Sequence, residues 1–247
     1  MAQLILPDSR LEMPELLHPG RKPVGNVEVD WSHPLSRGLV RVFVSPGEMV
    51  VGTTAYGSGS WEPRLGGLLT TDVGYGHDDL SLTGHSKFTV FCISQCKPEA
   101  ASGFDVRIGG LNGENGSQYN SLLMDYYGTD WSGNHPDFHS KMRVGASVDV
   151  RTLSFSVDDK YAPLCFAWSG GDGYERLLAG NSYAEYTKSG DVWSNTEIGL
   201  VIGKDFNSSS YYSRDTIHHA IYIFNRALSE SQLRDLQRNP YQFLVPA

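Results

Sequence analysis

The chain has 247 residues, of which 40% are hydrophobic and only 19% are charged, and its formal net charge is −8. This length and composition suit one large globular β domain and exclude a disordered or coiled-coil chain, which would be much more charged. The acidic balance argues against nucleic-acid binding, which needs a basic face, and the sequence has no run of about 18 apolar residues that could insert into a membrane.

The first thirty residues differ from the rest of the chain. They are rich in proline and charge, with short apolar pairs and no sustained period of 2 or 3.6. This pattern predicts an extended N-terminal arm over residues 1–30, followed by one domain over residues 31–247. Because a polar, proline-rich tail is mobile unless something holds it, we expect the arm to pack on its own domain or on a neighbouring subunit.

From Gly38 onward, short apolar runs alternate with clusters of glycine, asparagine, aspartate and serine. Such runs, with no helical pattern between them, predict an antiparallel β-sandwich or barrel. The predicted strands are residues 38–45, 87–96, 104–110, 121–127, 141–148, 152–157, 163–169, 175–180, 197–203 and 216–224.

Three cysteines, Cys92, Cys96 and Cys165, are too few and odd in number for a disulfide framework. Cys92 and Cys96 share one face of a predicted strand, and an isolated pair offers too few ligands for a metal ion. The preferred interpretation is small buried side chains in a reducing compartment, with no cofactor.

The stretch Met124–His139 reads MDYYGTDWSGNHPDFH and is predicted to form a long loop. Loops on a rigid β scaffold often carry binding, and this one combines aromatic rings that can stack on a pyranose with groups that can bind its hydroxyls. The candidate carbohydrate-binding residues are Tyr126, Tyr127, Asp130, Trp131, Asn134 and His135. The alternative is that these aromatic rings hold the loop in place or contact a partner subunit, because aromatic residues are also enriched at interfaces.

The last predicted strand, TIHHAIYIF, has two largely apolar faces, which indicates burial between two layers. Strand alternation places His218 and His219 on opposite faces, so we do not expect the pair to hold one metal ion. A short helix over about residues 230–238 follows. Ser229 and Gln232 form a capping box, Leu228 and Leu233 a hydrophobic staple, and Asn239 before proline ends the helix. A helix this short is unstable alone and must dock on the sheet.

The segment IYIFNRALSESQL resembles the closing signature of concanavalin A-like, laminin-G-like jelly-roll domains. Further segments similar to the family, GHDDLSL, FTVFCIS, PLCFAWSGG, ERLLAGN and EIGLVIGKD, occur in the family's order. Here Gly180-Asn181 reverses the usual Asn-Gly order of one turn. The opening VDWSHPLSRGLVRVFV and the tail RNPYQFLVPA are similar to such proteins from tailed bacteriophages. The resemblance spans roughly residues 30–243 and implies an all-β, two-sheet antiparallel sandwich with an N-terminal arm and one short C-terminal helix.

This resemblance implies a virion structural protein: a capsid decoration, head fibre or tail-associated subunit. Such a protein would be assembled in the host cytoplasm and would contact other virion proteins or copies of itself. The alternative is a carbohydrate-binding module for attachment to host or environmental glycans. A weaker alternative is a divergent glycoside hydrolase, which on this fold carries two carboxylates in the motif E-x-D-x-x-E. That motif is absent from the sequence, as is G-x-S-x-G, so we expect a protein that is not an enzyme.

Some laminin-G-like domains bind calcium, and the resemblance leaves that ion open here. The acidic candidates are Asp78, Asp79, Asp125 and Asp130. No contiguous loop with spaced oxygen ligands accompanies them, so solvated turn carboxylates are the preferred interpretation and no metal site is assigned.

Overall fold

A computed structural model describes the backbone of most of the predicted domain. The described residues are 26–44, 48–51, 56–57, 60–62, 67–70, 75–76, 87–96, 105–109, 121–127, 137–144, 147–155, 163–171, 173–187, 199–202 and 216–247. Side chains are described for 26–44, 87–94, 150–155, 163–171, 173–187 and 217–247, and for Met124, Phe138 and Ser140.

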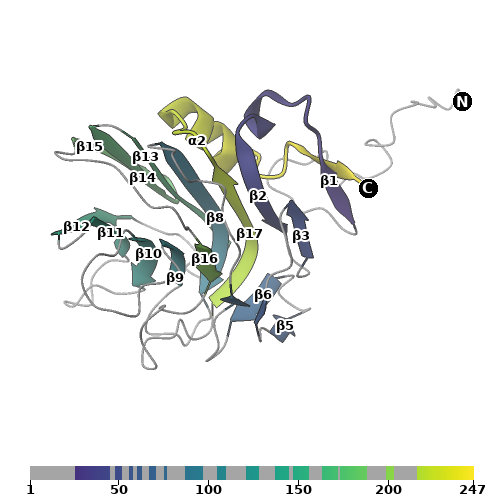
Figure 1. Cartoon of the computed structure of the whole chain (residues 1–247), viewed down its shortest axis with the longest axis horizontal. Helices are drawn as coiled ribbons and strands as arrows, with labels where there is room; N and C mark the ends of the chain where they lie inside the picture. The colour runs from purple at the N-terminus through teal and green to yellow at the C-terminus, as the bar shows by residue number, and fades with distance from the viewer. Residues whose placement is uncertain are drawn as a thin grey trace, which may run out of the picture.

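Within these residues the chain forms two large antiparallel sheets that face each other (Figure 1). One sheet has nine strands in the order β15-β14-β13-β8-β17-β2-β3, with β6 also paired to β17 and β5 paired to β6. Its strands are β2 (Leu39–Val44), β3 (Glu48–Val51), β5 (Ser60–Glu62), β6 (Gly67–Thr70), β8 (Phe88–Cys96), β13 (Leu164–Gly171), β14 (Tyr174–Ala179), β15 (Ser182–Thr187) and β17 (Thr216–Phe224).

The second sheet has seven strands in the order β12-β11-β10-β9-β16-β7-β4. They are β4 (Tyr56–Gly57), β7 (Tyr75–Gly76), β9 (Asp105–Gly109), β10 (Ser121–Tyr127), β11 (Asp137–Val144), β12 (Ser147–Ser154) and β16 (Gly199–Ile202). All of the described pairings are antiparallel, as the sequence predicts for an all-β sandwich.

The predicted strand over residues 141–148 is two strands. Lys141–Val144 ends β11, and β12 begins at Ser147 and pairs back on β11, with Val144 opposite Ser147. The apolar run continues through Gly145-Ala146, so composition alone does not reveal the reversal of direction.

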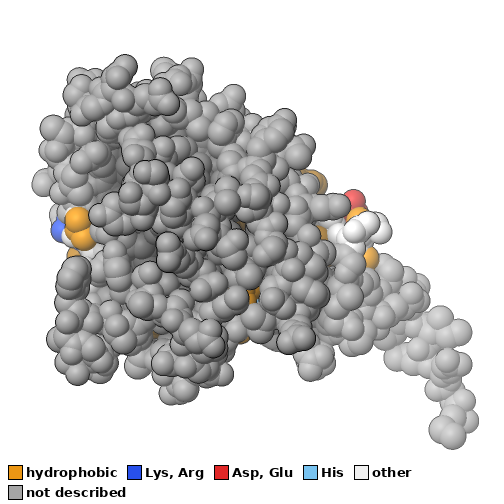
Figure 2. Space-filling view, turned by 90° about the horizontal axis from the view of Figure 1, so that it is seen from below, with side chains coloured by type: hydrophobic (Ala, Val, Ile, Leu, Met, Phe, Trp, Pro, Cys, Tyr) orange, Lys and Arg blue, Asp and Glu red, His pale blue; other side chains and the backbone are white. Residues whose placement is uncertain are grey.

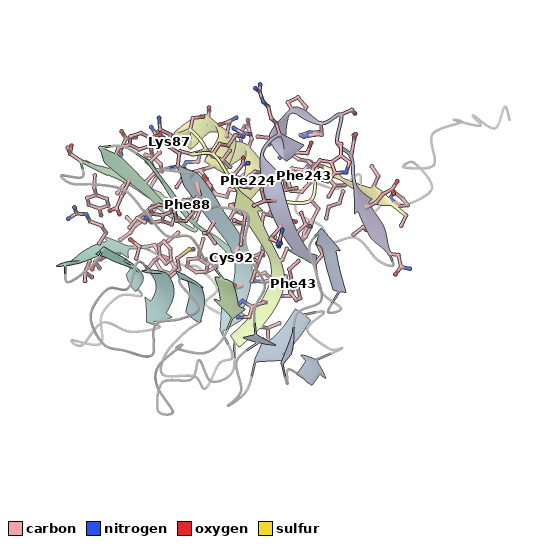
Figure 3. The ribbon with its side chains drawn as sticks, in the orientation of Figure 1. Phe43, Lys87, Phe88, Cys92, Phe224 and Phe243 are labelled. Carbon is pink, nitrogen blue, oxygen red and sulfur yellow. The ribbon has the colours of Figure 1, made fainter. Side chains whose placement is uncertain are left out.

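The central strands of the nine-stranded sheet carry buried apolar side chains on both faces. Phe166 of β13 lies on the face toward the other sheet, where its ring is 5.4 Å from Phe138 and 5.6 Å from Phe155. Phe88 and Cys92 lie on this same face (Figure 3). This inner layer forms the core between the sheets.

The opposite face of that sheet is covered by the helix α2 (Glu230–Arg238) and the C-terminal segment (Figure 1). Tyr222 stacks on Phe91 and meets Phe243 edge-on, with ring centroids 5.9 and 4.9 Å apart. Leu233 and Leu236 of the helix are buried in this second cluster. Burial of each leucine contributes about 1.5–3 kcal/mol, so docking supplies the stability that a nine-residue helix lacks by itself.

The helix begins and ends where the sequence predicts. The Ser229 side chain accepts from the Gln232 backbone N–H, the Gln232 side chain accepts from the Ser229 N–H, and the helix ends at Arg238, before Asn239. A 3-10 turn that the sequence pattern does not predict, η2 (Pro34–Ser36), also occurs. Among the described residues, no helix is long and apolar enough to cross a membrane.

The two ends of the domain meet in a separate two-stranded sheet of β1 (Val27–Val29) and β18 (Leu244–Pro246). The sequence places Val27–Val29 in the extended arm, and the structure ties these residues to the C-terminal strand. The remainder of the predicted arm, residues 1–25, lies outside the described residues, so its docking stays a prediction.

Candidate functional site

The predicted carbohydrate-binding residues lie at the connection between β10 and β11. Tyr126 and Tyr127 are not in a loop: they are the last residues of β10, in register with Phe138 and Asp137. Of the predicted loop, residues 124–127 belong to β10 and residues 137–139 to β11, and residues 128–136 lie outside the described residues. Asp130, Trp131, Asn134 and His135 lie outside the described residues, as do the side chains of Tyr126 and Tyr127, so their role stays a prediction.

His218 and His219 are both buried, and a β-bulge interrupts regular alternation beside them. The register between β17 and β8 shifts between His218 and Ala220, so that His218 is opposite Ser94 and Ala220 opposite Ile93. The prediction that the two histidines lie on opposite faces assumes regular alternation along the strand. The bulge interrupts that alternation here, so the prediction stays untested for His219. His218 Nδ1 lies 3.0 Å from Ser94 Oγ, on the face toward the other sheet.

Burial, with a smaller contribution from His219, lowers the pKa of His218 to about 3, so the ring is neutral at neutral pH. In the described part of the chain, no group of three or more histidine, cysteine or acidic side chains could hold a metal ion. Asp78, Asp79 and Asp130 lie outside the described residues, as does the side chain of Asp125, so a calcium ion there stays untested.

Cys92 and Cys165 are free thiols on neighbouring strands. Burial raises the pKa of Cys92, and it raises the pKa of Cys165 to about 12. Both therefore remain protonated and unreactive at neutral pH, which agrees with the predicted role of small packed side chains. The Cys96 side chain lies outside the described residues.

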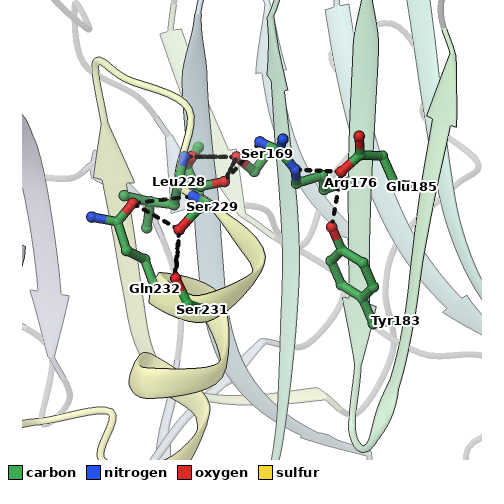
Figure 4. Close-up of polar contacts among 9 residues, drawn as sticks. Ser169, Arg176, Tyr183, Glu185, Leu228, Ser229, Ser231 and Gln232 are labelled. Carbon is green, nitrogen blue, oxygen red and sulfur yellow. Dashed lines mark hydrogen bonds and ion pairs between the residues drawn. The ribbon is translucent and has the colours of Figure 1, made fainter.

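Strands β14 and β15 carry the richest combination of rings and charges among the described side chains (Figure 4). Arg176 Nε donates to Glu185 Oε2 at 2.7 Å, and the Tyr183 hydroxyl donates to the same oxygen at 3.1 Å. The Arg176 guanidinium also lies 4.2 Å from the centroid of the Tyr174 ring. We call Tyr174, Arg176, Tyr183 and Glu185 the β14–β15 cluster.

The Arg176 hydrogen bond lowers the pKa of the exposed Glu185 carboxyl, and burial, with the Glu185 hydrogen bond, raises the pKa of Tyr183 to about 12. The β14–β15 cluster thus presents an ionised carboxylate, a guanidinium and two half-buried rings. These are the groups that can accept from and donate to sugar hydroxyls.

The β14–β15 cluster is tied to the start of the helix. Arg176 Nη1 donates to the Leu228 carbonyl at 3.2 Å, and the Ser169 hydroxyl donates to the same carbonyl at 2.9 Å. The Leu228 N–H in turn donates to the Ser169 hydroxyl at 2.8 Å (Figure 4). It also lies 2.9 Å from the Thr89 hydroxyl, to which it donates as well. These bonds satisfy the buried backbone groups at the strand-to-helix corner.

The β14–β15 cluster was not among the residues predicted from the sequence. The available signal was the hairpin around Gly180-Asn181, whose register brings Arg176 opposite Glu185. Opposite charges at directly paired positions of a hairpin share a face and can pair. The pairing of these two charges depends on the length of the turn between the strands. The reversed Gly-Asn order did not specify that length, so the pairing could not be predicted.

A second polar contact joins the edges of the two sheets. Arg151 Nε of β12 lies 3.3 Å from Oε2 of Glu175, which is buried, and the Arg151 guanidinium is 5.4 Å from the Tyr186 ring centroid. The Tyr186 hydroxyl donates to the Thr152 carbonyl at 2.9 Å.

Seen from below, the described side chains reach the surface mainly at opposite ends of the molecule (Figure 2). The exposed large hydrophobic side chains described are Trp31 and Val150, the latter next to Arg151.

No protein-family model matches this chain, and no curated protein matches it in sequence. Solved structures match it in fold. The CBM40 of the Ruminococcus gnavus IT-sialidase, bound to alpha2,3 sialyllactose, gives a TM-score of 0.50 at 13% identity over 66% of this chain and 92% of that module. The likeness is one of fold.

Two larger proteins match over most of this chain. Trypanosoma rangeli sialidase in complex with sialic acid gives a TM-score of 0.54 at 14% identity over 81% of this chain and 33% of the sialidase. The enzymatically active domain of the bacteriophage CBA120 tailspike protein 2 gives 0.52 at 12% identity over 76% of this chain and 31% of the tailspike chain. The chain thus corresponds to about a third of either protein.

These matches confirm the predicted β-sandwich. At such identities they show the fold alone, so the expected bacteriophage origin and the expectation that the chain is not an enzyme both stay predictions.

Proposed function

We propose that this chain is a carbohydrate-binding β-sandwich module. The observation that supports the proposal most strongly is the match to 92% of a CBM40 module. This match extends over nearly the whole of a module that was solved with a bound saccharide, whereas the matches to the sialidase and the tailspike cover about a third of each chain. Of the functions that the sequence leaves open, glycan attachment fits this match best.

Two surfaces are the proposed contacts for the saccharide. The first is the β10–β11 connection, where Tyr126, Tyr127 and Trp131 would stack on sugar rings, as the sequence predicts. The second is the β14–β15 cluster, where Tyr183 is half-buried and the Glu185 carboxylate is exposed and ionised. Aromatic stacking with adjacent polar groups is a mode of recognition that either surface can support.

A glycan array probed with the full chain tests the proposal, and two tryptophan variants locate the contact. Trp131→Ala should weaken binding to the best saccharide on the array at least tenfold. Trp31→Ala removes an indole that is 60% exposed on a different segment, next to β1, and should leave binding unchanged. Equal affinities of Trp131→Ala and the unaltered chain would exclude the β10–β11 connection as a contact for the saccharide. Tyr183→Ala would then test the β14–β15 cluster.

A virion subunit is the second candidate function. The observation that favours it is the match to the bacteriophage tailspike domain, which covers 76% of this chain. The sequence resemblance to laminin-G-like proteins of tailed bacteriophages points the same way. We propose that, in this case, residues 1–30 dock the module on other virion proteins and leave the sandwich available for attachment.

Mass spectrometry of purified particles, with electron microscopy, tests this second candidate. The chain should be present in particles, and deletion of residues 1–25, which leaves β1 intact, should reduce its incorporation. Absence of the chain from particles would exclude the virion role without affecting glycan binding. Incorporation of the deletion variant at the level of the full chain would exclude the docking role of the arm.

A further inference from the structure

Arg37 and Arg226 lie together at the end of the β2–β17 pair. Arg226 Nε donates to the Arg37 carbonyl at 2.6 Å, and the Asn225 N–H donates to the carbonyl of the intervening Gly38 at 2.7 Å. Gly38 has φ +79°, and a Cβ at this position would come within 2.7 Å of Asn225 Oδ1 and 3.1 Å of Arg226 Cδ. The glycine therefore lets the Arg226 stem lie directly on the turn that carries Arg37.

These two guanidiniums have no counter-charge among the described residues. Of the described arginines, Arg151, Arg176, Arg234 and Arg238 each form an ion pair with a carboxylate. Within the described residues no carboxylate pairs with Arg37 or Arg226, and the Arg37 side chain makes no hydrogen bond there. The only acceptor of Arg226 among the described side chains is the neutral Gln232 Oε1, 3.3 Å from its Nη1.

Burial and charge both act against the Arg226 guanidinium at this turn. Burial and the neighbouring Arg37 charge both lower the pKa of Arg226, although a guanidinium remains charged at neutral pH. The chain as a whole carries a net charge of −8, so two neighbouring arginines are not explained by a generally basic protein. Like charges held together are destabilising, and an oxyanion between them would reverse the sign of that interaction.

We propose that Arg37 and Arg226 form an anion-binding site for the carboxylate of an acidic saccharide. Guanidinium groups bind carboxylates through paired, charge-assisted hydrogen bonds, which suits an acidic sugar better than a neutral one. The Asn225 amide, beside Gly38, adds a neutral polar group that can bind adjacent hydroxyls. The choice of a saccharide rests on the proposed function, whereas the preference for an anion rests on the arginine pair.

The two arginines have different roles in a test. The Arg226 side chain also holds the turn through the Arg37 carbonyl, so its replacement disturbs the fold. Arg37 is exposed, contributes only its carbonyl to that bond and can be replaced without loss of any hydrogen bond or ion pair to the described residues. The matched control is Arg238, which is exposed and already paired with Asp235 at 2.8 Å. Arg37→Ala and Arg238→Ala change the net charge equally.

D-Glucuronate and D-glucose are the matched probes, because they differ at one carbon by a carboxylate. Glucuronate, at equal ionic strength, should raise the Tm of the full chain and of Arg238→Ala, and glucose should give a smaller shift. Arg37→Ala should bind glucuronate at least about tenfold more weakly, the loss expected for a charge-assisted hydrogen bond. Equal glucuronate shifts for all three proteins would overturn the proposal, because the anion would then bind elsewhere.

Sodium sulfate separates the anion site from glycan binding. Sulfate stabilises proteins in general by exclusion from their surfaces, so the informative quantity is the difference between the unaltered chain and Arg37→Ala. A sulfate shift that depends on Arg37, with no saccharide bound on the array, would keep the anion site and reject the proposed function. Array binding with no Arg37-dependent shift from glucuronate or sulfate would reject the anion site and keep the proposed function.

Discussion

At the scale of single residues, the capping chemistry of the last helix was predictable because it is local. Ser229 and Gln232 are three residues apart, and this spacing by itself predicts their reciprocal bonds. The Arg176–Glu185 pair was not predictable, because it depends on hairpin register. The register beside His218 was not predictable, because a β-bulge shifts it between His218 and Ala220 and no residue type marks the bulge.

The buried His218 predicts a pH-dependent stability. Its folded pKa of about 3 lies below the unfolded value of about 6.5, so between these values only the unfolded chain binds a proton. The contribution of His218 to the free energy of unfolding should therefore be complete above pH 6.5. It should fall as the pH decreases toward 3, by up to about 1.4 kcal/mol per pH unit. His218→Gln should have a shallower slope between pH 4 and 6.5 in urea titrations. An unchanged slope would show that His218 does not titrate in this way.

Loss of the Ser169 hydroxyl should destabilise the strand-to-helix corner. Ser169→Ala removes bonds to both the Leu228 carbonyl and the Leu228 N–H, all within buried structure. We expect a loss of about 1–3 kcal/mol in the free energy of unfolding, measured by urea titration. Thr187→Ala, at an exposed position at the end of β15, is the control and should change stability by less than about 0.5 kcal/mol. A similar loss in both variants would contradict the role given to this corner.

At the scale of elements, strands were predicted from alternating apolar runs, and most of the predicted runs coincide with observed strands. The predicted strand over residues 152–157 begins inside β12, which ends at Ser154, and the strands β3, β4, β5, β6 and β15 were not predicted. Two further exceptions are places where a turn lacks a sequence marker. The 141–148 run continues through a reversal, and the predicted loop at Met124–His139 includes the ends of two strands. In each case aromatic or apolar residues lie on both sides of the boundary, so composition does not locate it.

Removal of a buried leucine from the helix α2 should lower the stability of the whole domain substantially. Leu233 is fully buried against the nine-stranded sheet, and Leu233→Ala should lower the free energy of unfolding by about 2–5 kcal/mol. The loss should appear as a lower urea midpoint with an unchanged slope. A loss below about 1 kcal/mol would mean that the helix does not hold the end of β17 as the packing indicates.

Alanine substitutions at two glycines with positive φ distinguish the cost of backbone strain from the cost of a steric clash. Gly173, at φ +83°, has space for a side chain, because no atom of the described residues lies within 4 Å of the position that a Cβ would take. Gly173→Ala should therefore cost only the left-handed strain of about 1–2 kcal/mol. Gly38→Ala adds a contact of 2.7 Å to Asn225 Oδ1 and should cost more. Thermal unfolding of both variants measures the difference. Equal costs would mean that the Asn225 side chain moves aside and that the turn at Gly38 is not tightly packed.

At the scale of the whole molecule, the sandwich class followed from the pattern, but the strand order did not. β17 lies between β8 and β2, and β13 pairs with β8, so neighbours in the sheet are far apart in sequence. Such pairings depend on which apolar faces fit together, and no local signal specifies them. The surfaces that matter for function arise from this order, which is why the β14–β15 cluster and the Arg37–Arg226 pair became visible only in the fold.

The glycan array with the full chain tests the central claim most directly. A carbohydrate-binding sandwich predicts saturable binding to at least one saccharide class, removed by the free saccharide as competitor. The anion site adds the prediction that carboxylate-bearing members of that class bind more tightly than their neutral counterparts. Absence of saturable binding to every saccharide, with a chain shown to be folded by cooperative thermal unfolding, would contradict the proposed function.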